Sequence, residues 1–364
     1  MRQPPARTYG SRREKLRELC EGGLLILYRG DTGFHENLYY LTGLNVPNTA
    51  LLLSLDTDIE VGLVSSIDEH AARAQSGFAE LQVSRQLTED LARIVGDLKP
   101  ARVHVDFGSD SQGEAIGFVR HMAGILPKTE FETAPAQLVT MRATKDVWEI
   151  GCLHNAALNG RAALDAAVGA LAPGVSELEV AAEAMAVLVR NGATRPAMPI
   201  VAFGENTVHP HHIPTDRCLS AGDVVLLDVY GEAADNYCCD LTETLVWGTA
   251  DPEAERGIDA VREVQEEIAG KLRKGVTLAQ IDAWVGEALD RRALGRYYLG
   301  RACHLLGLSE HDPLSEDRGL EEGAVFALEP GVYDLGRRHG VRVERTYLIR
   351  QAGAVDLEWR TGTF

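Results

Sequence analysis

Four acidic residues of this 364-residue chain lie inside segments that otherwise read as apolar, half-buried β-strands, and a histidine stands between the second and the third. The five residues are Asp228, Asp240, His304, Glu329 and Glu344. A buried carboxylate without a cationic partner is costly, and it normally stays protonated or pairs with a base. Four such acids and one histidine therefore predict a site for divalent metal, and we expect it to hold two ions.

The acids fall in two predicted hairpins. If the first hairpin turns about Ala234, its two aspartates lie directly opposite each other. In the second hairpin the two glutamates are equidistant from the Gly336–Arg337 junction. Like charges directly opposite on neighbouring strands are destabilising, and metal cations would cancel that repulsion. The register is an assumption of this prediction, because a one-residue slip turns a side chain to the other face.

An internal repeat surrounds these hairpins. The segments PGVSELEVAAEAMAVL and KGVTLAQIDAWVGEAL share a Gly-Val pair, a hydroxyl residue (Ser176 or Thr277) and, three residues on, Glu179 or Gln280. Each pattern is a capping box at the start of a helix. Each segment follows a predicted long helix and precedes an acid-bearing hairpin. Two such halves, 101 residues apart (277 − 176), predict a pseudo-twofold α+β domain, with chance similarity as the alternative.

The chain is long enough for two domains. Residues 1–138 alternate strand-like and helix-like patterns and predict a small α/β domain without a catalytic cluster. From Asp146 one long helical pattern runs until Pro173 and Gly174 end it. We therefore expect the boundary within residues 138–145 and a second domain over residues 139–364.

Composition excludes several classes of protein. A net charge of −18 argues against a nucleic-acid partner, since such proteins normally present a basic face. No apolar run approaches the roughly 20 residues of a membrane span, and the polar N-terminus does not resemble a signal peptide. The six cysteines form no CxxC pair, which fits a reducing compartment. We expect a cytoplasmic protein with neither a nucleic-acid nor a membrane partner.

Two segments supply candidate histidines beside the acids. CHLLGLSEHD contains His304 and His311, and VAFGENTVHPHHIPTDRCL contains His209, His211 and His212. A single histidine in an apolar segment is often only a core residue, and spacing alone does not tell which member of the trio acts. Imidazole suits transition metals and carboxylates suit hard ions, so the mixed set points to Mn²⁺, Co²⁺, Fe²⁺ or Zn²⁺.

These residues resemble the pita-bread metallopeptidases, the family of prolidase, aminopeptidase P, methionine aminopeptidase and creatinase. The resemblance is carried by the ligand order Asp, Asp, His, Glu, Glu and by LLDVYGEAADNYCCDLTET, HLLGLSEHD, LEPGVY and VRVERT. It covers essentially the whole chain, and implies a creatinase-like N-terminal α/β domain before a pita-bread catalytic domain. An N-terminal domain of this size is typical of the proline-specific branch.

The resemblance also implies a role for each of the five ligands. Asp228 would chelate one ion, while Asp240 and Glu344 would bridge both. His304 and Glu329 would complete the other ion, and Glu329 would also accept a proton. The implied cofactor is two divalent ions, with Mn²⁺ favoured over Co²⁺ and Zn²⁺.

Further residues take roles from the same resemblance. His211 and His311 fall on the two active-site histidines of the family, and His311 would contact the scissile amide. Arg342 matches an arginine near the bridging acid. His212 and Arg318 are candidate substrate contacts, the latter for the substrate carboxylate, for which the chain has no clear match.

The chain departs from the family at one wall of the site. The family usually carries a His-Gly-x-Gly run just before the metal histidine, whereas this chain has Gly300-Arg301-Ala302-Cys303. The close backbone approach that glycine allows is therefore in doubt there.

The implied activity is hydrolysis of Xaa-Pro bonds by a homodimer acting on small peptides with proline at the second position. An Xaa-Pro dipeptidase (prolidase) is favoured, with aminopeptidase P, which accepts longer peptides, as the alternative. Two other classes remain: a metal-free, creatinase-like C–N hydrolase and a non-catalytic interaction module of the same fold. The complete ligand set argues against both.

Overall fold

The computed structural model describes residues 7–75, 81–249, 251–314, 318–334 and 338–358. The chain divides into two compact units, which meet in sequence between Met141 and Arg142, inside the helix α6 (Ala136–Ala143). Each unit has its own hydrophobic core.

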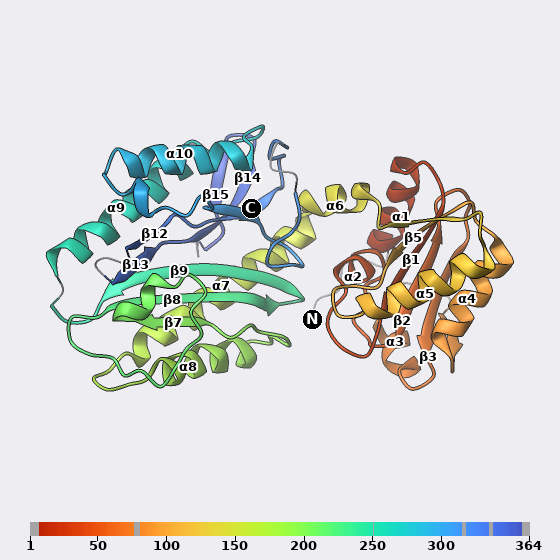
Figure 1. Ribbon diagram of the computed structural model, residues 1–364, viewed down its shortest axis with the longest axis horizontal. Helices are drawn as coiled ribbons and strands as arrows, with labels where there is room; N and C mark the ends of the chain where they lie inside the picture. The colour runs from red at the N-terminus through yellow and green to blue at the C-terminus, as the bar shows by residue number, and fades with distance from the viewer. Residues whose placement is uncertain (1–6, 76–80, 250, 315–317, 335–337, 359–364) are drawn as a thin grey trace. The chain divides into compact units, whose positions relative to one another are not determined.

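The N-terminal unit is built on a six-stranded sheet with the strand order β4-β3-β2-β1-β5-β6 (Figure 1). Its strands are β1 (Leu24–Arg29), β2 (Thr49–Ser54), β3 (Glu60–Ser65), β4 (Leu81–Ser84), β5 (Arg102–Asp106) and β6 (Glu130–Thr133). Its helices are α1 (Arg7–Leu19), α2 (Glu36–Thr42), α3 (Glu69–Gln75), α4 (Leu87–Leu98) and α5 (Gln112–Ile125). Apolar residues of β1, β2 and β5 pack against α4 and α5 to form the core.

The C-terminal unit begins its first half with a long helix and ends it with a hairpin. The elements of this half are α7 (Val147–Ala170), α8 (Glu177–Arg190), β7 (Ile200–Phe203), η1 (Gly204–Val208), β8 (Val224–Ala234) and β9 (Tyr237–Val246). A capping box of Asp146 and Glu149 starts α7, as the helical pattern predicted. Helix α7 packs against β8 and β9 (Figure 1), so the strands bury that face.

The second half also begins with two helices and continues with strands. Its elements are α9 (Pro252–Ala269), α10 (Leu278–Asp290), η2 (Gly295–Tyr297), β10 (Cys303–Leu305), β11 (Val325–Leu328), β12 (Gly331–Asp334), β13 (His339–Arg342), β14 (Arg345–Arg350) and β15 (Gly353–Asp356). Helices α9 and α10 contribute most of the helical residues of the core on this side.

The predicted repeat is present in the backbone. Both capping boxes form, at Ser176 with Glu179 before α8 and at Thr277 with Gln280 before α10. Each capping residue also makes an isolated β-bridge to a residue 42 positions later, Ser176 to Cys218 and Thr277 to Gly319. The capping boxes and the β-bridges of the two halves therefore correspond at an offset of 101 residues, and each half continues into an acid-bearing hairpin.

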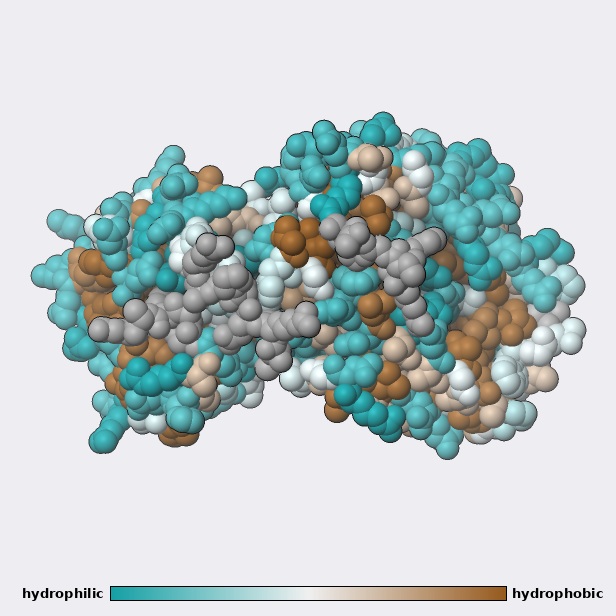
Figure 2. Space-filling view, turned by 180° about the vertical axis from the view of Figure 1, so that it is seen from behind, coloured by the Kyte–Doolittle hydropathy of each residue, from teal (hydrophilic) through white to brown (hydrophobic). Residues whose placement is uncertain are grey.

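The surface is mixed in character. On the face seen in Figure 2, hydrophilic side chains alternate with separate hydrophobic patches. Within the described ranges, no helix combines the length and the apolar character that crossing a bilayer requires.

Candidate metal centre

The first two acids lie on one face of the β8–β9 hairpin, but they are not opposite each other. Asp228 pairs with Thr242, and Asp240 pairs with Tyr230. The predicted register was wrong because the turn lies at Asp235–Asn236, where both residues have positive φ, and a bulge shifts the ladder beside it. The two aspartates are diagonal neighbours on the same face, which still brings their carboxylates into one site.

The second pair of acids has the predicted register. Leu328 pairs with Arg345 on β11–β14, and Gly331 pairs with Arg342 on β12–β13. Glu329 and Glu344 lie between these pairs and are equidistant from the same hairpin centre. The centre itself, Gly336–Arg337, lies outside the described residues. The two glutamates therefore face each other across the break between the two ladders.

His304 extends from β10 toward these acids. Its Nδ1 lies 3.2 Å from the Leu305 carbonyl oxygen; because a carbonyl only accepts, Nδ1 carries the proton and Nε2 is free to bind. Nε2 is 3.3 Å from Asp240 Oδ2 and 3.5 Å from Glu329 Oε1. The tautomer thus leaves a ligand nitrogen between two carboxylates, an arrangement that suits a metal.

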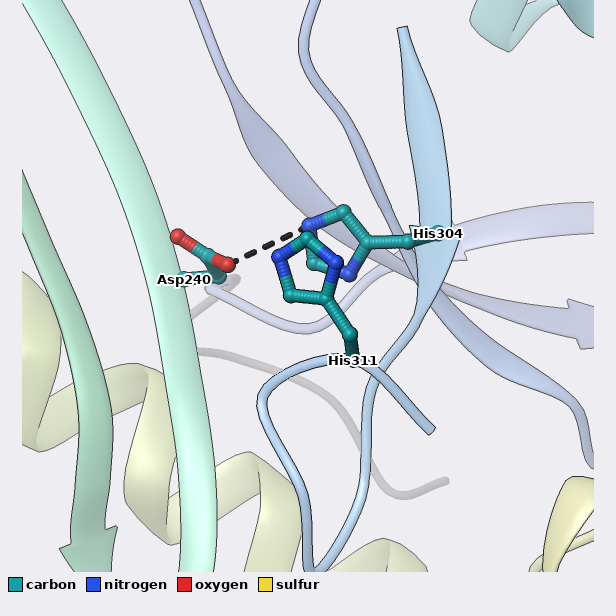
Figure 3. Close-up of side chains that lie close together, drawn as sticks. All are labelled: Asp240, His304 and His311. Carbon is teal, nitrogen blue, oxygen red and sulfur yellow. Dashed lines mark ion pairs between the residues drawn. The ribbon is translucent and has the colours of Figure 1, made fainter. Parts of the chain in front are cut away.

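All five predicted ligands come together. Three overlapping groups have ligand atoms within 4.8 Å of one another: Asp240, His304 and His311; His304, Glu329 and Glu344; and Asp228, Asp240 and Glu344. Figure 3 shows the first group, with Asp240 on β9, His304 on β10 and His311 on the loop that follows. The members therefore come from both halves of the repeat.

The buried carboxylates lack enough donors. Asp228 is 6% exposed and Glu344 is 1% exposed. Within the described structure, Asp228 Oδ1 and Glu344 Oε1 have no hydrogen-bond partner. Burial and the neighbouring acids raise the pKa of Asp240 and of Glu344 well above the ordinary range. Orphaned oxygens beside mutually repelling acids fit a centre that binds divalent cations.

Arg342 stabilises one side of the centre. Its Nη2 donates to Asp228 Oδ2 at 2.6 Å and its Nε donates to Thr242 Oγ1 at 3.1 Å. Its Nη1 donates to the Tyr333 hydroxyl at 2.8 Å. Thr242 Oγ1 in turn donates to Glu344 Oε2 at 2.7 Å. The arginine therefore orients one acid directly and a second through a threonine.

A cavity of about 340 Å³ opens over the acids. It is lined by the predicted residues His211, His212, Asp228, Asp240, His304, His311, Glu329, Arg342 and Glu344, together with Met198, Ile200, Ile213, Pro214, Tyr230 and Glu310. Arg318, the remaining predicted site residue, is exposed and does not line this cavity. His209 does not line it either, but its ring stacks near His212, with centroids 6.5 Å apart.

A buried glutamate holds the histidine-rich loop. Glu177, at the start of α8, is fully buried. Its Oε2 lies 2.8 Å from His212 Nε2 and accepts from the Thr215 backbone N–H at 3.0 Å. Its Oε1 accepts from the Phe203 N–H at 2.8 Å. These bonds fix His212, whereas His211 is exposed at the cavity.

His311 lies against His304. The two rings are stacked, with centroids 3.9 Å apart and planes within 5° (Figure 3). Partial burial, the adjacent His304 and Arg301 lower the pKa of His311 to about 4. The ring therefore faces the site as a neutral imidazole at neutral pH.

The loop that carries His311 is held by a buried ion triad. Asp312 accepts from the Arg142 guanidinium and from Lys145 Nζ, the latter at 3.3 Å. Its Oδ1 also accepts from the Ser309 backbone N–H at 3.4 Å. The triad lies within the C-terminal unit and anchors the loop immediately after His311.

Sequence reasoning missed three residues of the site. Tyr230 could have been found, because it is two residues after Asp228 and so shares its face of the strand. Glu310 directly precedes His311, and burial together with nearby Asp228 raises the pKa of its carboxyl to about 7. Glu177 gave no signal beyond its place at a helix start, since its role depends on contacts with residues 26 to 38 positions away.

Known proteins resemble the chain in sequence and in fold. A dipeptidase-like protein of Bacillus subtilis, named a putative dipeptidase, is 32% identical over 63% of this chain and 64% of its own length. The Xaa-Pro dipeptidase of Pyrococcus furiosus is 30% identical over 63% of this chain and 66% of its own length. These matches span slightly under two thirds of each relative.

Solved structures agree over nearly the whole chain. The Xaa-Pro dipeptidase from Bacillus anthracis superposes with a TM-score of 0.85, at 22% identity, over 99% of both chains. A putative aminopeptidase P from the same species gives 0.86, at 20% identity, over 98% of this chain and 95% of its own. The α+β pita-bread fold is thereby confirmed.

The family model matches the region that contains every predicted ligand. Residues 151–351, more than half of the chain, match the model of metallopeptidase family M24. This range includes both hairpins and the histidine-bearing segments. The chain belongs to metallopeptidase family M24.

Proposed function

We propose that this protein is a dinuclear metallopeptidase that hydrolyses Xaa-Pro bonds, acting foremost as an Xaa-Pro dipeptidase. The observation that supports it most is the meeting of two acid hairpins and His304 at one cavity, where two carboxylate oxygens have no hydrogen-bond partner among the described residues. The relative from Pyrococcus furiosus carries the name of this activity. Aminopeptidase P is the second candidate, because a structure with that description shares the fold.

The proposed metal ligands are the five predicted residues. Asp228 would hold one ion, Asp240 and Glu344 would be shared by both, and His304 with Glu329 would hold the other. Bound divalent ions acidify water and polarise the substrate carbonyl. Four carboxylates and one imidazole suit Mn²⁺, with Co²⁺ and Zn²⁺ as further candidates.

The other residues act on protons and on the substrate. Glu329, whose side chain is 24% exposed at the cavity, accepts a proton during the reaction. His211 and His311 contact the peptide, and a neutral His311 donates a hydrogen bond to the scissile amide. Arg342 and His212 are proposed substrate contacts, although both also orient neighbouring groups. A proline ring is recognised by shape, because Xaa-Pro bonds lack an amide N–H.

Assembly and compartment belong to the same proposal. A homodimer follows from the resemblance to proline-specific relatives. Cytoplasmic location is supported by six cysteines without a CxxC pair. The substrate carboxylate needs a basic partner; Arg318 remains a candidate only if it moves, since it lies outside the cavity lining.

The test is a peptide panel on chelator-treated protein reloaded with Mn²⁺, Co²⁺ or Zn²⁺. Hydrolysis of Ala-Pro and of Ala-Pro-Gly distinguishes the two candidates. Cleavage of Ala-Pro at least tenfold faster supports the dipeptidase, and the reverse preference supports aminopeptidase P. If neither peptide is hydrolysed with any of the three metals, the proposed activity is contradicted.

A further inference from the structure

Within the described structure, five acidic side chains line the cavity, and four of them belong to the proposed metal set. The fifth is Glu310, in the loop after β10. Its side chain is 36% exposed, and the ion-pair distance recorded for it is 3.9 Å, from Oε1 to His311 Nε2. That distance is too long for a hydrogen bond. Glu310 therefore presents a carboxylate to the cavity, and no described residue is a close cationic partner.

The other charges of the cavity have partners. Two divalent cations carry as much positive charge as the four carboxylates of the metal set carry negative charge. Arg342 is the single arginine or lysine among the described lining residues, and it is held by Asp228, Thr242 and Tyr333. Among the described lining residues, Glu310 therefore has no arginine or lysine paired with it. A partly buried carboxylate is stabilised when a cationic ligand binds beside it.

The loop that carries Glu310 and the side chain of Arg342 contact β9 at different residues. The loop that carries Glu310 contacts β9 at Cys238, whose backbone N–H donates to the Gly307 carbonyl at 2.9 Å. Arg342 instead bonds to Thr242 and, through its backbone N–H, to Thr244. Asp240 lies between these contacts along the strand. Arg342 is thus engaged by Asp228 and by the threonines of β9.

The cavity also offers apolar and aromatic surface. Tyr230 and Met198 line the cavity. Both residues share this cavity with Glu310. Lysine and arginine combine an apolar stem with a charged end, and their cations bind aromatic faces as well as carboxylates. The surroundings of Glu310 match this combination.

We propose that Glu310 is a specificity-determining residue that selects substrates with a lysine or arginine side chain by pairing with its cation. The proposal rests on the proposed peptidase function. In an Xaa-Pro dipeptide the cation must come from Xaa, because proline carries no charged side chain. The α-ammonium group is common to all such dipeptides, so a preference for lysine reports on the side chain.

The test compares lysine with norleucine, which has the same stem and no charge. Metal-loaded wild-type protein and Glu310→Gln are assayed on Lys-Pro, norleucyl-Pro, Lys-Ala and norleucyl-Ala. We expect the wild type to prefer lysine about tenfold in kcat/KM, as one charged pair in a half-exposed site supports. Glu310→Gln should bring the lysine-to-norleucine ratio to about one.

The control is Glu287→Gln on the exposed side of α10, which removes the same charge away from the cavity. It should leave the lysine preference unchanged. A wild type without the preference overturns the inference, and so does a Glu310→Gln variant that loses activity equally on both side chains. If only the alanine peptides are cleaved, the proline proposal fails, while the ratio of Lys-Ala to norleucyl-Ala still decides the role of Glu310.

Discussion

At the scale of single residues, the site combines acids that repel one another with one histidine in a fixed tautomer. His304 Nδ1–H donates a hydrogen bond to the Leu305 carbonyl, and Nε2 lies near Asp240 and Glu329. Metal binding and catalysis can be tested separately here, because the side chain of His311 is more exposed than those of the proposed acidic ligands. Two predictions follow from that separation and from the raised pKa values.

Asp240→Asn should abolish metal loading and activity together, since Asp240 is the proposed bridging ligand. His311→Ala should lower kcat by about 10²- to 10⁴-fold and leave loading largely intact, because its proposed role is in proton and hydrogen-bond transfer. Metal content by mass spectrometry and kcat on Ala-Pro measure both effects. Asp259→Asn on the exposed surface of α9 is the matched control. Equal loss of metal in both variants would contradict the assignment of His311.

The metal-free protein should lose stability as pH rises from 5 to 8. The pKa values of Asp240 and Glu344 are raised in the folded state, so these groups keep protons that the unfolded chain has already released. Their contribution is complete below the unfolded pKa and is lost as pH rises through the folded pKa, by up to about 1.4 kcal/mol per pH unit and group.

Urea unfolding with a chelator at several pH values measures this slope. Asp240→Asn should make the slope shallower, because its amide does not titrate. Added Mn²⁺ should reverse the trend, since deprotonated ligands bind metal more strongly. A chelated wild type whose stability is constant or increases over this range would refute the prediction.

At the scale of elements, close packing of helix α7 on the β8–β9 hairpin supports the metal face. A Cβ on Gly160 would lie 2.8 Å from Cys239 Sγ and 2.8 Å from Leu241 Cδ1. Cys239 and Leu241 flank Asp240 in sequence and point to the opposite face of the strand. Glycine at position 160 therefore lets the strand that carries Asp240 approach the helix.

Gly160→Ala should destabilise the protein by about 1–3 kcal/mol, because the added methyl group overpacks this contact. Gly151 is the matched control, since it lies in the same helix, is exposed and has nothing within 4 Å of an added Cβ. Gly151→Ala should instead stabilise the helix by up to about 1 kcal/mol. Free energies of unfolding from urea titration compare them. Effects of the same sign at both positions would argue against the packing explanation.

At the scale of the whole molecule, two units with separate cores share one chain. All five proposed ligands belong to the unit that begins at Arg142. Ligand binding to a folded state stabilises the unit that contains the site, by about 2.7 kcal/mol at a concentration 100 times the Kd.

Differential scanning calorimetry should therefore resolve two transitions, only one of which moves to lower temperature when a chelator is added. Asp240→Asn provides the control, because its profile should not respond to the chelator. Equal shifts of both transitions would show that the units unfold together.

The sequence by itself determined the local features and the composition of the site. The capping boxes at Ser176 and Thr277, the helix start at Asp146 and the register of the second hairpin were predicted correctly. Capping and helical periodicity depend on residues three or four positions apart, so the chain records them directly. The order of the ligand types likewise identified the family before any geometry was known.

Tertiary structure alone decided how these parts meet. The register at Asp228 depends on a turn and a bulge. The position of His212 depends on a hydrogen bond to the distant Glu177. The surroundings of Glu310 depend on a loop that packs against another strand. Each of these features depends on a contact between segments far apart in sequence or on the backbone dihedrals of a turn. Neither can be predicted from the spacing of residues.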